Sequence, residues 1–140
     1  MDIITVSIAV AVAMIGYFQL RTAQQQVALD LFDRRIETYN ALREVVSAVQ
    51  GSSCAATPEN EFKFLRAIDR AEFLFGQEII RELYLIHKAI GGVRISLAVK
   101  DAAAEHKWRD AALNGFYSTL QPLFARYLRM DQKLPQYPWG

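Results

Sequence analysis

Few side chains in this sequence are suited to metal binding or nucleophilic catalysis, and they are far apart. The chain has two histidines, His87 and His106, and one cysteine, Cys54. No cysteine or second histidine stands near either histidine at the spacing of zinc ligands. Cys54 lies among serine and alanine, so the sequence places no base or cation beside its thiol. We therefore expect no metal, no cofactor and no catalytic residue.

Binding of nucleotides or nucleic acids is not indicated either. The segment Gly91-Gly92-Val93-Arg94 lacks the further glycines, the lysine and the hydroxyl group of a phosphate-binding loop. The formal net charge is only +1, whereas nucleic-acid-binding domains usually carry a basic excess. We expect a protein that is not an enzyme, that binds no nucleic acid and that has no evident small-molecule substrate.

The densest cluster of charges falls in one short stretch. Its members are Asp30, Asp33, Arg34, Arg35 and Glu37. One interpretation is a solvated helix face with pairs four residues apart. The other is an ion-pair network between helices or subunits, and it makes Arg34 and Arg35 candidate partner contacts. On a second helix the matching charges are Arg66, Asp69, Arg70 and Glu72.

The first twenty residues indicate where the chain resides. Residues 3–20 contain no charged side chain. A helix of that length rises about 27 Å, close to the hydrocarbon thickness of a bilayer, about 30 Å. Tyr17, Phe18 and Arg21 suit a membrane interface at its end. We predict a transmembrane anchor over residues 1–21, with a buried soluble helix as the alternative; a cleaved signal peptide would need a basic start.

The flanking charges predict the orientation of this anchor. All 16 lysines and arginines follow residue 20, whereas the only charged side chain before the apolar run is Asp2. The positive-inside rule then places the N-terminus outside and the main domain in the cytoplasm.

A face of small residues runs along the anchor. Ala9, Ala13 and Gly16 are spaced four and three residues apart and share one side of a helix. Small residues let helices approach closely in lipid, where packing drives association. We predict that this face is a transmembrane packing site for a second copy or another subunit's helix. Alternatively, the alanines only add apolar length to a short span and have no packing role.

Three-and-four spacing of apolar residues continues through the rest of the chain, with no strand pattern. We predict an all-α fold in which the transmembrane helix continues into a cytosolic antiparallel bundle of three to four helices over residues 22–130. The expected buried faces of the first two helices are Leu29, Phe32, Ile36, Tyr39, Leu42, Val46 and Val49, then Phe62, Leu65, Ile68 and Phe75.

Glycine and proline predict where these helices begin and end. The first helix should end at Gly51, and Thr57-Pro58 should cap and begin the next one. A turn is needed at Gly76 or at Gly91-Gly92, and the helix lengths favour Gly76. Pro122 predicts a kink or a restart just before it.

The last ten residues, 131–140, contain two prolines and predict an extended tail. Tyr137 and Trp139 are its only large aromatic side chains, and each has an apolar body and a polar group. We predict that they contact a partner or the membrane interface. The alternative is that the tail lies back on its own helices.

Three segments carry a resemblance to known proteins. They are Leu-Phe-Asp-Arg-Arg-Ile-Glu-Thr-Tyr at 31–39, Phe-Leu-Phe-Gly at 73–76 and Leu-Phe-Ala-Arg-Tyr-Leu at 123–128. Together with the apolar N-terminus, they resemble a widespread group of uncharacterised small bacterial single-pass membrane proteins. The resemblance implies a helical inner-membrane protein and brings no catalytic residues.

Two functions are compatible with this sequence. The first is a non-enzymatic accessory or scaffold subunit of a membrane complex, whose partners are the lipid bilayer and other membrane protein subunits or a second copy. The second is a membrane-acting effector, for example of anti-phage defence, that oligomerises through its transmembrane helix. Such an effector needs a polar stripe on the anchor, and Thr5 with Ser7 forms only a thin one.

Overall fold

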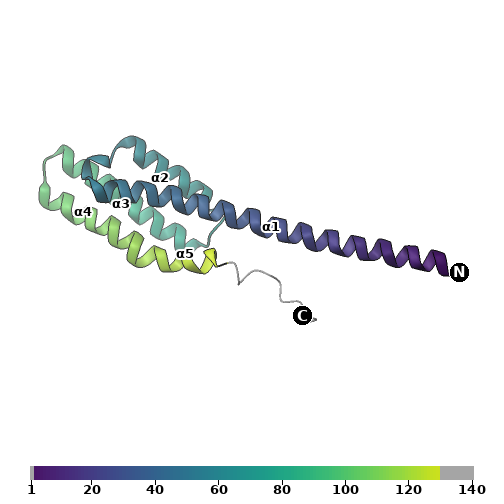
Figure 1. Ribbon diagram of the computed structural model, residues 1–140. Helices are drawn as coiled ribbons and strands as arrows, with labels where there is room; N and C mark the ends of the chain where they lie inside the picture. The colour runs from purple at the N-terminus through teal and green to yellow at the C-terminus, as the bar shows by residue number, and fades with distance from the viewer. Residues whose placement is uncertain (1, 130–140) are drawn as a thin grey trace. The chain divides into compact units, whose positions relative to one another are not determined.

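The computed structural model describes residues 2–129, and these residues are helical without any strand (Figure 1). The all-α class predicted from the sequence is confirmed for this part of the chain. The tail at 131–140, with Tyr137 and Trp139, lies outside the described residues. The elements in chain order are α1 (Ile3–Gly51), η1 (Ser53–Ala55), α2 (Pro58–Ala71), α3 (Gln77–Ala98), α4 (Ala102–Asn114), η2 (Gly115–Leu120) and α5 (Gln121–Leu128).

The described chain forms two units, residues 2–32 and Asp33–Arg129. The first is the beginning of α1, and its apolar side chains are exposed along its length. Within the described chain, α1 is the one helix that is long and apolar enough to cross a membrane, and none of its apolar window is buried.

The second unit, Asp33–Arg129, holds the hydrophobic core. All of α2 to α5, together with the second half of α1, contribute buried side chains to it. Its largest fully buried side chains are Phe64, Phe116, Phe124, Leu42, Ile68, Ile79, Leu83, Ile86, Ile90, Leu120, Val46 and Val49.

The buried face of α1 differs from the predicted one. Leu29 is exposed, and Ile36 is only half-buried. Arg35 and Thr38 occupy the interior positions instead. Polar side chains are stable there because each finds a backbone acceptor: Thr38 Oγ1 donates to the Arg34 carbonyl at 2.8 Å, and Arg35 Nε donates to the Leu74 carbonyl at 2.9 Å.

The buried face of α2 also differs from the prediction. Phe62 is 54% exposed, whereas Phe64 is fully buried. Two overlapping patterns fit three-and-four spacing in this segment, and the true one passes through Phe64, Ile68 and Ala71. Phe62 is two positions from Phe64 and points elsewhere, where the guanidinium of Arg66 lies 4.6 Å from its ring centroid.

The predicted helix boundaries are confirmed. Thr57 caps α2, because its Oγ1 accepts the Asn60 N–H at 3.2 Å, and Pro58 is the first helical residue. Gly76 forms the turn before α3, in extended conformation. A methyl group at Gly76 would overlap the Glu78 carboxylate and the Tyr127 hydroxyl, so the ends of these two side chains would have to shift.

The irregularity predicted near Pro122 is also confirmed. The helical path from Ala102 to Leu128 is interrupted by the π-helical turn η2 at Gly115–Leu120, and Pro122 falls in the first turn of α5. The wider turn accommodates a ring that cannot donate a backbone hydrogen bond.

The two glycines inside α3 have different surroundings. An added methyl group at Gly92 would lie 2.6 Å from Cγ of Trp108 on α4, whereas at Gly91 its nearest neighbour would be 3.8 Å away. Gly92 therefore allows α3 and α4 to approach closely, and Gly91 has no such role.

This contrast gives a matched pair of variants. Gly92→Ala should lower the free energy of unfolding by about 1–3 kcal/mol, because the indole must move. Gly91→Ala should raise it by about 0.5–1 kcal/mol through better helix propensity. Denaturant unfolding of the full chain in mild detergent measures both. Equal effects of the two changes would contradict the close approach at Gly92.

Candidate functional site

The residues with catalytic or metal-binding chemistry are dispersed in the structure. Within residues 2–129 no group of three or more His, Cys, Asp or Glu side chains could hold a metal ion. His87 stacks on Phe64, with ring centroids 6.4 Å apart. His106 Nε2 lies 3.4 Å from Asp110 on the same exposed helix face. Cys54 is exposed on η1.

The most buried charge in the second unit is Arg35. Its Nε donates to the Leu74 carbonyl at 2.9 Å, and its Nη1 donates to the Tyr127 carbonyl at 3.4 Å. The guanidinium carbon lies 5.9 Å from the ring centroid of Phe75 and 5.3 Å from that of Tyr127. Arg35 thus joins α1, the α2–α3 corner and α5. The pKa of Arg35 lies below its usual value, because burial lowers it by more than the electrostatic interaction with Tyr127 raises it.

A second polar contact lies beside Arg35. The Tyr127 hydroxyl donates to Glu78 Oε1 at 2.7 Å and ties α5 to the first turn of α3. This hydrogen bond raises the pKa of the Tyr127 phenol and lowers that of the Glu78 carboxyl. The contact therefore stabilises the neutral phenol and the ionised carboxylate together, an arrangement that holds two helices and leaves neither group poised for proton transfer at neutral pH.

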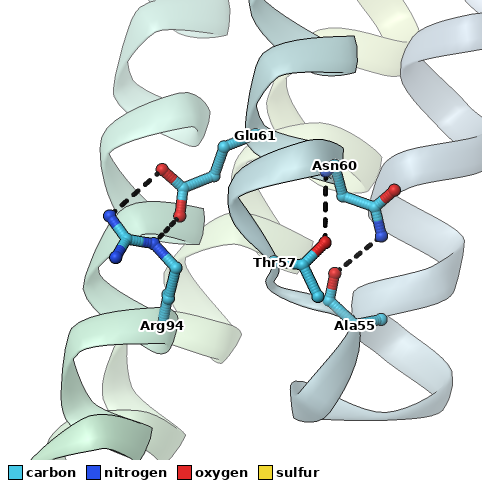
Figure 2. Close-up of polar contacts among 5 residues, drawn as sticks. All are labelled: Ala55, Thr57, Asn60, Glu61 and Arg94. Carbon is cyan, nitrogen blue, oxygen red and sulfur yellow. Dashed lines mark hydrogen bonds and ion pairs between the residues drawn. The ribbon is translucent and has the colours of Figure 1, made fainter.

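The third polar cluster joins η1, α2 and α3 (Figure 2). Arg94 Nε and Nη2 both donate to the carboxylate of Glu61, the second bond at 3.5 Å. This hydrogen bond raises the pKa of Arg94. Beside it, Asn60 Nδ2 donates to the Ala55 carbonyl at 2.7 Å. The side chains of Glu61, Arg94 and Asn60 are all bonded within this cluster, so these contacts hold the start of α2 in place.

A groove of about 230 Å³ lies between the second half of α1 and α2. Its floor consists of small or branched apolar side chains, and its edges are charged. The lining residues are Ala41, Glu44, Val45 and Ala48 on α1 and Asn60, Lys63, Arg66, Ala67 and Arg70 on α2.

The two predicted partner contacts of the charge cluster, Arg34 and Arg35, differ in their exposure. Arg34 is exposed, whereas Arg35 is 8% exposed and bonded inside the second unit. One ion pair between the predicted helices is present: Arg70 Nη1 lies 3.9 Å from Glu37 Oε1, and both side chains are largely exposed. An exposed pair of this kind stabilises a fold by at most about 1 kcal/mol.

The predicted transmembrane packing residues lie in the first unit. Ala9, Ala13 and Gly16 are helical and exposed, and nothing lies within 4 Å of a methyl group added at Gly16. Their role in packing stays a prediction.

Three features of the candidate site were not predicted from the sequence. The Glu61–Arg94 pair joins residues 33 positions apart, the Tyr127–Glu78 bond joins residues 49 apart, and the groove depends on the spacing of two helices. None of the three has a local signal in the sequence.

No protein-family model matches the chain, and no significant match is found among curated proteins or solved structures.

Proposed function

We propose that this protein is a non-enzymatic single-pass protein of the bacterial inner membrane. In this proposal residues 1–21 anchor it, residues 22–130 form a cytosolic helical bundle, and the whole acts as an accessory or scaffold subunit of a membrane complex. The observation that carries the proposal is the beginning of α1, an apolar helix none of whose spanning window is buried. So much exposed apolar surface needs lipid or another helix to cover it.

The second unit supports a binding role for the cytosolic part. Its polar clusters around Arg35 and Glu61 hold helices together, and its charged groove offers a surface for another helix. Lipid, membrane protein subunits or a second copy are the partners of such a molecule.

The alternative, a membrane-acting effector of the anti-phage kind, fits the anchor less well. The Ser7 hydroxyl donates to the Ile3 carbonyl at 2.8 Å, so it is satisfied within its own helix. This reduces the polar surface with which several anchors would line a pore.

Membrane insertion has a direct test. Val12→Arg should remove most of the protein from the carbonate-resistant membrane fraction, because an arginine near the centre of a span costs about 2.5–3.5 kcal/mol. The control is Val27→Arg, the same change at a similarly exposed valine beyond the anchor, which should stay in the membrane. Fractionation of expressing cells followed by blotting measures both.

Two results would contradict the proposal. One is a wild-type chain that carbonate extracts completely. The other is a reporter fused after Gly140 that works in the periplasm and is silent in the cytosol, because that result reverses the proposed orientation.

A further inference from the structure

We draw no further inference here: the strongest candidate, the groove between the second half of α1 and α2, carries nothing, because its cations Lys63 and Arg70 are already paired within the chain and nothing in the structure shows what covers it.

Discussion

Replacing Phe124 with alanine should lower the free energy of unfolding by about 3–5 kcal/mol, the usual cost of removing a fully buried aromatic ring. Phe124 is 0% exposed on α5, and its ring packs edge-on against two others. The centroid distances are 5.1 Å to Tyr39 on α1 and 4.9 Å to Phe75 before α3. One ring therefore holds three segments, and its loss leaves a cavity that none of them can fill alone.

The matched control is Phe73→Ala. The chemical change is the same, but Phe73 is 89% exposed, so its effect should stay within about 0.5 kcal/mol. Denaturant unfolding of the full chain in mild detergent gives both values. A loss below about 1 kcal/mol for Phe124→Ala, or equal losses at the two positions, would show that α5 is not part of the cooperative core.

Local signals were sufficient for the class of the fold and for most of its boundaries. Thr57-Pro58 predicted the start of α2, Gly76 the corner before α3 and Pro122 the irregularity before α5. Each signal is a property of the residue itself. Thr57 offers a side-chain acceptor to the free N–H groups of a helix start, Gly76 has no side chain, and Pro122 lacks a backbone N–H donor.

The helix faces were harder to predict because three-and-four spacing is degenerate when apolar residues are frequent. Residues 62–68 contain Phe62, Phe64 and Leu65, and two different faces satisfy the period. The buried face is the one that contains Phe64, because this face continues through Ala71 and Phe75 into the rest of the core. The neighbouring helices decide which face of a helix is buried, so the local spacing of apolar residues cannot predict it.

The polar clusters illustrate a second limit. Arg35 stands in a run of charges that resembles a solvated helix face, yet it is buried among carbonyls and rings. Its acceptors come from residues 39 and 92 positions away. Long-range partners decide whether a charge is exposed or buried, so the sequence alone left Arg34 and Arg35 equivalent.

Arg35→Met should lower the free energy of unfolding by about 1–3 kcal/mol. Methionine keeps an apolar stem but leaves the carbonyls of Leu74 and Tyr127 without the guanidinium donors, and an unsatisfied buried acceptor costs about that much. The contacts with the rings of Phe75 and Tyr127 are lost as well. Removal of a buried cation offsets part of this loss, because burial disfavours the charged form.

The neighbouring Arg34→Met provides the control. Arg34 is exposed, so the same substitution one residue away should change the free energy of unfolding by less than about 1 kcal/mol. Arg35→Lys separates charge from hydrogen-bonding geometry: an ammonium group keeps the charge but cannot donate from two separate nitrogens, so it should recover only part of the stability. If Arg35→Met were neutral or stabilising, the guanidinium would not be what joins α1 to the α2–α3 corner and α5, and packing of the aromatic rings would have to hold these three segments together without it.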